Sequence, residues 1–89
     1  MNKQELKEIL KKQIIEELNL QDIKPEDIED DAPLFGDGLG LDSIDALEVI
    51  VLLEKHHGIK ITDEKLGKKI LYSVNTIAEY IEQENLKTR

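Results

Sequence analysis

Residues 40–48 mark the start of a helix and read Gly40-Leu41-Asp42-Ser43-Ile44-Asp45-Ala46-Leu47-Glu48. Asp42 is predicted to be the N-cap, and Asp45 stands at the third helical position, as in a capping box. Ser43 then lies in the first turn, where unpaired backbone N–H groups and the helix dipole favour an anion such as a phosphodiester. Local chemistry alone still favours an ordinary first-turn serine. A functional assignment therefore depends on the rest of the chain.

The helix that begins at Ser43 is predicted to run to His57 and to stop at Gly58, which suits the C′ position. At about 100° per residue, its core stripe comprises Ala46, Val49, Ile50 and Leu53. The two flanks carry Leu47 and Leu52. Ile44 and Val51 point nearly opposite the stripe. Either the helix is buried nearly all round, or these two residues form an exposed apolar spot among acids. The small size of the chain favours the exposed spot, which suggests a partner-binding face.

Three other segments have helical periodicity. The first helix is predicted from about Lys3 to Leu18. A short third helix begins at Thr62 or Asp63 and runs to about Lys69. Its Leu66 is expected to face inward. Ser73 caps a last helix, whose apolar residues are Val74, Ile77, Ala78 and Ile81.

The connections are a long loop and a short buried segment. Residues 19–41 lose the periodicity and are interrupted by Pro25, Pro33, Gly36, Gly38 and Gly40. The loop is expected to be pinned to the core by Ile23, Ile28, Leu34 and Phe35. Residues 59–61 alternate like a strand but have no partner strand, so they are interpreted as a buried connector. The predicted fold is all-α, a small bundle of three main helices plus one short helix. Residues 1–89 form one domain, with a core of about 3–83 and a frayed C-terminal tail.

The composition limits the possible functions. The chain has 89 residues, no cysteine, 3% aromatic residues and a formal net charge of −8. Disulfides, thiol nucleophiles and base-stacking platforms are therefore excluded or disfavoured. Such a charge repels nucleic acids and anionic membranes and favours basic protein surfaces. No apolar run approaches the length of a membrane span. A monomeric cytoplasmic protein without membrane insertion is expected.

Neither a metal site nor a catalytic centre is predicted. His56 and His57 point about 100° apart on a helix and lack convergent ligands. Either histidine would lie about 20 Å along the helix from Ser43, so a hydrolase triad is disfavoured. The acids are concentrated between Asp22 and Glu48, where Lys24 is the only base. Such a segment is typical of a solvated surface, but its position around Ser43 favours docking.

The string Asp-Ser-Ile-Asp after a Gly-rich loop, followed by Ala-Leu-Glu, resembles the phosphopantetheine attachment site of acyl carrier proteins. The resemblance extends from the first helix to Ile81 and is strongest from Ala32 to Ile61. It implies that Ser43 carries 4′-phosphopantetheine derived from coenzyme A, with Asp42 as the adjoining motif residue and helix cap. The thiol of this arm would hold acyl groups as thioesters. The chain would then be a carrier and not an enzyme.

The resemblance also implies two surfaces. Carriers of this family dock through the helix that follows the serine, and the matching residues beside Asp42 are Ile44, Asp45, Glu48, Val51 and Glu54. Family members shelter acyl chains between this helix and the next two. The candidates for that lining are Phe35, Ala46, Val49, Leu53, Ile61 and Leu66, although each can equally be an ordinary core residue.

The implied partners are a phosphopantetheinyl transferase and acyl-loading or ketosynthase-type enzymes with basic patches. The chain departs from the common fatty-acid pattern at Leu41, Ile44 and Leu47. Its third-helix region is unusually basic, with Lys60, Lys65, Lys68 and Lys69. These departures favour a specialised lipid or polyketide-like pathway over housekeeping fatty-acid synthesis. Two alternatives stay open: a peptidyl or amino-acyl carrier, and an unmodified acidic helical interaction module.

Overall fold

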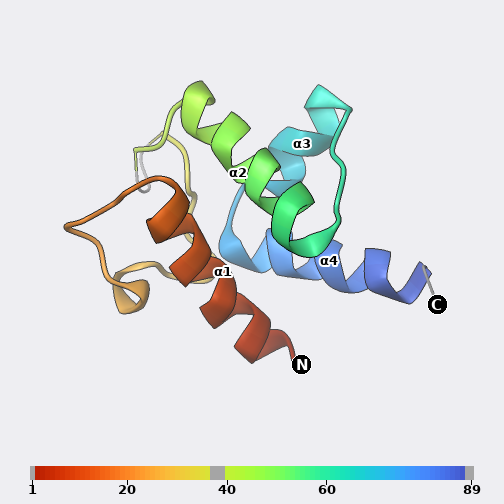
Figure 1. Cartoon of the computed structure of the whole chain (residues 1–89), viewed down its shortest axis with the longest axis horizontal. Coiled ribbons are helices and arrows are strands. Elements are labelled where there is room, and N and C mark those ends of the chain that lie inside the picture. The colour runs from red at the N-terminus through yellow and green to blue at the C-terminus, as the bar shows by residue number, and fades with distance from the viewer. Residues whose placement is uncertain (1, 37–39, 88–89) are drawn as a thin grey trace.

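The computed structural model describes residues 2–36 and 40–87 and contains four α-helices within them (Figure 1). They are α1 (Lys3–Glu17), α2 (Ser43–His57), α3 (Glu64–Ile70) and α4 (Val74–Lys87), and the loop after α1 contains a 3-10 turn, η1 (Pro25–Asp27). The described residues form no β-strand. This confirms the predicted all-α bundle of three main helices plus one short helix.

Side-chain caps begin the helices close to where the sequence places them. Asn2 begins α1, Asp63 begins α3 and Ser73 begins α4. A side-chain oxygen of each accepts a backbone N–H of the first turn, at 2.8, 3.0 and 3.2 Å respectively. Of the two candidates for the third helix, Asp63 rather than Thr62 forms the cap.

The helix ends agree with the sequence to within a few residues. Gly58 has φ of +66°, a left-handed conformation that suits glycine, and it terminates α2 as predicted. The first helix ends at Glu17, one residue before the predicted Leu18. The last helix continues to Lys87, so the segment after residue 83, expected as a frayed tail, is helical that far. Residues 88–89 of that tail lie outside the described residues.

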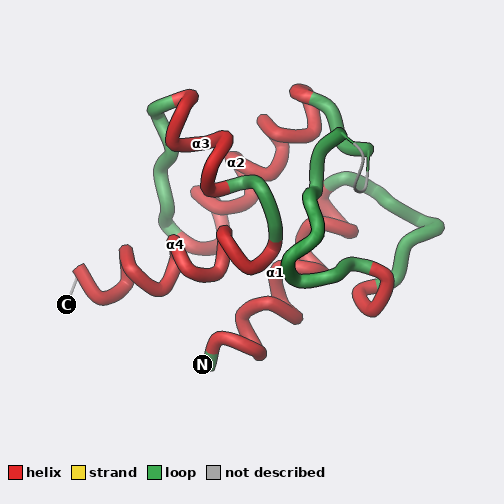
Figure 2. Tube along the Cα trace, turned by 180° about the vertical axis from the view of Figure 1, so that it is seen from behind, coloured by secondary structure: helices red, strands yellow, loops and turns green. Residues whose placement is uncertain are grey.

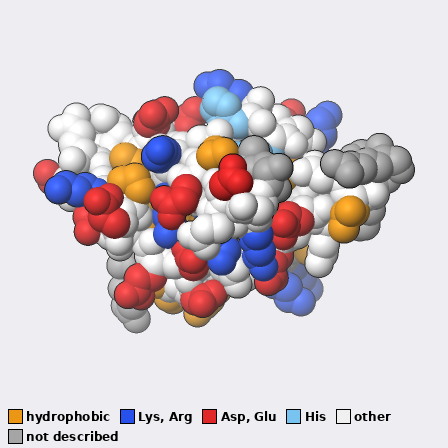
Figure 3. Space-filling model, turned by 90° about the horizontal axis from the view of Figure 1, so that it is seen from below, with side chains coloured by type: hydrophobic (Ala, Val, Ile, Leu, Met, Phe, Trp, Pro, Cys, Tyr) orange, Lys and Arg blue, Asp and Glu red, His pale blue; other side chains and the backbone are white. Residues whose placement is uncertain are grey.

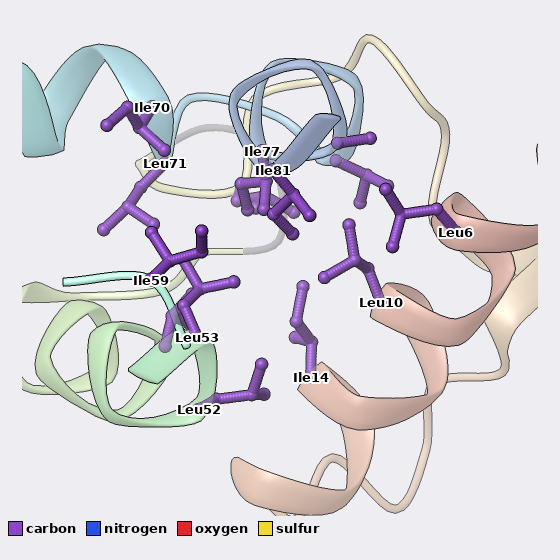
Figure 4. Close-up of a cluster of buried hydrophobic side chains, with 14 of the residues drawn as sticks. Leu6, Leu10, Ile14, Leu52, Leu53, Ile59, Ile70, Leu71, Ile77 and Ile81 are labelled. Carbon is purple, nitrogen blue, oxygen red and sulfur yellow. The ribbon is translucent and has the colours of Figure 1, made fainter. Parts of the chain in front are cut away.

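The core lies where α1, α2 and α4 meet (Figure 4). Large buried side chains converge there, among them Leu10 and Ile14 from α1 and Ile77 and Ile81 from α4. Leu52 of α2 is also fully buried, and the prediction that it lies on a flank is wrong. A single core stripe assumes one burial direction, whereas α2 also packs against α1. The fully buried residues of α2 are Val49, Leu52 and Leu53.

The short helix α3 buries a different side from the one predicted. Leu66 is 40% exposed, so the expectation that it faces inward is wrong. Gly67, about 100° further round the helix, is buried instead, and Ile70 follows it on the same side. A Cβ atom on Gly67 would lie 3.2 Å from Cγ2 of Ile61. The small residue therefore lets α3 approach the 59–61 connector closely and turns Leu66 outward.

The loop between α1 and α2 is fastened to the junction of α3 and α4 (Figure 2). Ile28 and Leu34 are buried and Ile23 and Phe35 pack against the core, which confirms the four predicted anchors. The backbone N–H of Leu34 donates to the Tyr72 carbonyl at 2.9 Å, and that of Asn75 donates to the Asp30 carbonyl at 2.8 Å. Of the glycines predicted to interrupt this loop, Gly38 lies outside the described residues.

An ion pair that the sequence pattern did not indicate joins this loop to α1. Lys11 is buried, and its Nζ lies 2.7 Å from Oδ1 of Asp30, an atom with no hydrogen-bond partner of good geometry. Lys7 Nζ lies 3.4 Å from the other carboxylate oxygen. Contact with the Lys11 ammonium group, supported by Lys7, holds the pKa of Asp30 below its ordinary value despite partial burial.

A half-buried histidine links the C-terminal end of α2 to α1. Nε2 of His57 donates to Oε1 of Gln13 at 2.8 Å. Burial lowers the pKa of His57 below 6.5, and the neighbouring His56 lowers it further. Just below pH 6.5 the unfolded chain therefore binds more protons than the folded protein, so the free energy of unfolding falls as the pH is lowered through this range.

We expect His57→Gln to weaken the pH dependence of stability. The variant lacks the group whose pKa is depressed in the folded state, so its free energy of unfolding should fall less than that of the parent between about pH 7.5 and about pH 5.5. Urea unfolding across this range measures the difference. His56→Gln removes only the smaller cause of the shift and should weaken the pH dependence less, and equal slopes for the parent and His57→Gln would contradict the linkage.

Candidate functional site

Ser43 is the first residue of α2, and its side chain is exposed. Asp42 caps the helix: its Oδ1 accepts hydrogen bonds from the backbone N–H groups of Ile44 and Asp45, at 3.0 and 3.1 Å. In return Asp45 Oδ2 accepts the Asp42 N–H at 3.0 Å. The predicted capping box is confirmed, and it presents the Ser43 hydroxyl to solvent at a defined place.

The same bonds correct one expectation about this turn. An anion on Ser43 was expected to find unpaired backbone amides, but those of Ile44 and Asp45 already donate to the Asp42 carboxylate. Two carboxylates thus occupy the start of the helix, where an anion would otherwise be stabilised. A phosphate ester on Ser43 would therefore gain little from the start of the helix and would be stabilised by water or by a positive group from elsewhere.

The chain before Asp42 is held by backbone contacts. Leu41 is buried and forms an isolated parallel bridge with Phe35. Its N–H donates to the Leu34 carbonyl at 3.4 Å. Gly40 has φ of +76°, which a glycine adopts without strain. Since Leu34 is itself bonded to Tyr72, the position of Ser43 depends on the junction between α3 and α4.

A cavity of about 720 Å³ lies beside Ser43. We call it the α2–α3 cavity, because α2, α3 and the 59–63 connector supply most of its walls. Within α2 its lining residues are Ser43, Ile44, Ala46, Leu47 and Ile50. The other apolar and aromatic lining residues are Pro33, Phe35, Leu41, Ile61, Leu71 and Tyr72. Its volume is that of a ligand pocket, which typically encloses about 300–1,000 Å³.

The exposed side of α2 carries an apolar stripe. Ile44 is 69% exposed, Leu47 63% and Val51 55%. This confirms that Ile44 and Val51 are exposed and adds Leu47, which was placed on a flank. Glu48 and Glu54 lie beside the stripe and are exposed, and Asp45 is half-buried. Figure 3 shows a face of a different kind, the molecule seen from below, where acidic and basic side chains are intermixed and apolar side chains are few.

Comparison with known proteins gives this geometry a context. A family model described as a phosphopantetheine attachment site matches residues 8–82. The chain belongs to the acyl carrier protein family. An acyl carrier protein of Buchnera aphidicola subsp. Acyrthosiphon pisum (strain Tuc7) is 42% identical over 82 residues, covering 92% of this chain and 95% of the relative. One of Wolinella succinogenes is 33% identical over 73 residues, covering 82% and 88%.

The cofactor of this carrier family is 4′-phosphopantetheine, and the residues around Ser43 fit such a group. An exposed hydroxyl offers a point of attachment, and the adjoining α2–α3 cavity has room for an extended arm or its apolar cargo. The fit is incomplete only at the helix start, where the two carboxylates of the capping box face any phosphate.

The six candidate lining residues of the carrier separate into three groups. Phe35, Ala46 and Ile61 line the α2–α3 cavity. Val49 and Leu53 are fully buried in the core and do not line it. Leu66 also lies outside the lining, because α3 turns this side chain towards solvent. The sequence pattern missed Ile50, which shares a wall with Ala46, four residues earlier on the same helix face.

Other kinds of site find little support in the described part of the carrier. Among residues 2–36 and 40–87, no three His, Cys, Asp or Glu side chains are grouped so that they could bind a metal ion. Within the same ranges, no helix has the length and apolar character needed to cross a bilayer.

We expect the two neighbouring residues at the helix start to differ in their effect on stability. Asp42→Ala removes both cap bonds and should lower the free energy of unfolding by about 1 kcal/mol, within a range of about 0.5–2. Ser43→Ala should change it by less than about 0.5 kcal/mol, because the hydroxyl is exposed. Urea unfolding of both variants provides the measurement. A loss in Ser43→Ala as large as that in Asp42→Ala would show that the hydroxyl is structural.

Proposed function

We propose that Ser43 carries 4′-phosphopantetheine and that the chain presents acyl groups to partner enzymes of fatty-acid, lipid or polyketide-like synthesis. The observation that carries this proposal is the position of the Ser43 hydroxyl. It is exposed, it is fixed at the first turn of α2, and it borders the mainly apolar α2–α3 cavity. The matched family region, residues 8–82, includes this serine.

Attachment requires a partner enzyme. Ser43 Oγ forms the new bond to phosphorus and loses its proton, while the phosphoanhydride P–O bond of coenzyme A breaks and adenosine 3′,5′-bisphosphate leaves. No histidine lies near to accept that proton, since His56 and His57 stand at the other end of α2, about 20 Å away at 1.5 Å per residue. The base is therefore assigned to a transferase. When bound, the arm supplies a thiol that can hold an acyl group as a thioester.

Docking is assigned to the exposed side of α2. Ile44, Leu47 and Val51 offer apolar contact, and Glu48 and Glu54 add negative charge beside them. Asp45, half-buried in the capping box, belongs to the same side. A partner with a basic patch around an apolar depression complements this surface. The net charge of −8 steers such partners and raises the rate of association at low salt.

The pathway is proposed to be a specialised one. Four lysines give the third-helix region a positive character within an acidic chain, namely Lys60, Lys65, Lys68 and Lys69. All four are exposed. A surface that pairs an acidic helix with a basic one favours a partner enzyme of matching charge pattern over a general set of basic partners.

Intact mass tests the attachment site directly. After incubation with coenzyme A and a broad-specificity phosphopantetheinyl transferase, the parent chain should gain one phosphopantetheine, and Ser43→Ala should gain none. An established carrier protein serves as the positive control for the transferase. Loading of Ser43→Ala at another residue would contradict the site. No gain by the folded parent would favour the unmodified interaction module.

The same transferase tests the docking surface. Glu48→Lys should lower its kcat/KM by about fivefold at about 20 mM salt, and the loss should shrink at about 500 mM salt because ions screen the charges. Asp22→Lys, which makes the same change of charge at an exposed position in the long loop, is the matched control. Equal losses in the two variants, or a loss independent of salt, would remove α2 from the docking account.

A further inference from the structure

Lys68 is the one cationic side chain, among the residues that the structure describes, that lines the α2–α3 cavity. It lies in the last turn of α3 and shares this cavity with Ser43. Lys68 is exposed and forms no ion pair with any side chain that the structure describes, although ion pairs occur elsewhere on the chain. An ammonium group therefore lies on the α3 wall of the cavity that Ser43 borders.

The helix that bears Ser43 offers no such charge. Its first turn is occupied by the carboxylates of Asp42 and Asp45, and the backbone N–H groups of Ile44 and Asp45 are already engaged. The first basic residue of α2 is Lys55, about three turns from Ser43. A phosphodiester on Ser43 would thus add a third negative charge to a turn that cannot neutralise it.

We propose that Lys68 is the counterion of the phosphodiester on Ser43 and directs the attached arm towards α3. This inference rests on the proposed attachment at Ser43. A lysine ammonium group is a compact charge on a flexible stem, and such a stem can run along an apolar wall while its head meets an anion. The pair forms at the exposed mouth of the cavity, so it is weak and sensitive to salt, and a docking enzyme can separate it.

The chain provides a closely matched control. Lys69 follows Lys68 in the same last turn of α3 and is also exposed, but it does not line the cavity. Removing either charge changes the interaction with the dipole of α3 similarly. A difference between Lys68→Gln and Lys69→Gln is therefore due to the position of Lys68 in the cavity lining and not to the loss of a charge from α3. Lys68→Arg keeps the positive charge and should preserve the effect.

The experiment uses the parent, Lys68→Gln, Lys69→Gln and Lys68→Arg, each loaded by the transferase and verified by intact mass. The phosphorus NMR resonance of the parent should move when salt is raised from about 20 mM to about 500 mM, because the ion pair is screened. Lys68→Gln should already resemble the high-salt state, whereas Lys69→Gln and Lys68→Arg should behave like the parent. At low salt, the difference in Tm between the loaded and the unloaded protein should be about 1–5 °C smaller for Lys68→Gln than for the parent, because the variant lacks the ion pair.

The outcomes separate the two proposals. Full loading of Lys68→Gln with an unchanged phosphorus resonance and an unchanged Tm difference would overturn the role of Lys68 and leave the attachment site intact. Equal effects of Lys68→Gln and Lys69→Gln would also overturn it, since general charge would then explain the result. Failure of the parent to load would contradict the attachment at Ser43 and this inference with it.

Discussion

The two hydrogen bonds from the first turn of α2 to the Asp42 carboxylate define the start of the helix that carries Ser43. They fix the residue at which α2 begins, and a helix that begins at a fixed residue has a fixed angular phase. Further along the helix, Val49, Leu52 and Leu53 are buried in the core, while Ile44 and Leu47 are exposed. The exposed serine is a consequence of the same phase, since it occupies the first helical position directly after the cap.

Much of this arrangement could be predicted, because it depends on local chemistry. Asp42, Asp63 and Ser73 cap helices through bonds to residues two or three positions away, so short stretches of sequence carry the information. Leu52 and Leu66 were misplaced because their burial depends on which neighbour covers each side of a helix. A helical wheel gives the direction of each side chain but not which neighbouring element covers it.

The ion pair of Lys11 with Asp30 shows a different limit. The two residues belong to segments that the sequence does not relate, and each alone looks like an ordinary surface charge. Only the packing of the long loop against α1 brings them within 2.7 Å. The α2–α3 cavity is similar, since its walls come from four separate segments. The position of the cavity depends on the fold, whereas the motif around Ser43 can be recognised in the sequence alone.

The backbone bonds that fasten the long loop have a consequence for biosynthesis. Asp30 and Leu34 are joined to Asn75 and Tyr72, partners that follow them by roughly half of the chain. A ribosome must therefore synthesise most of the protein before the segment preceding Ser43 can take its final shape. A modifying enzyme that recognises the finished surface around that serine would pass over nascent chains. Under the proposed attachment, a modified Ser43 would thus indicate that folding is complete.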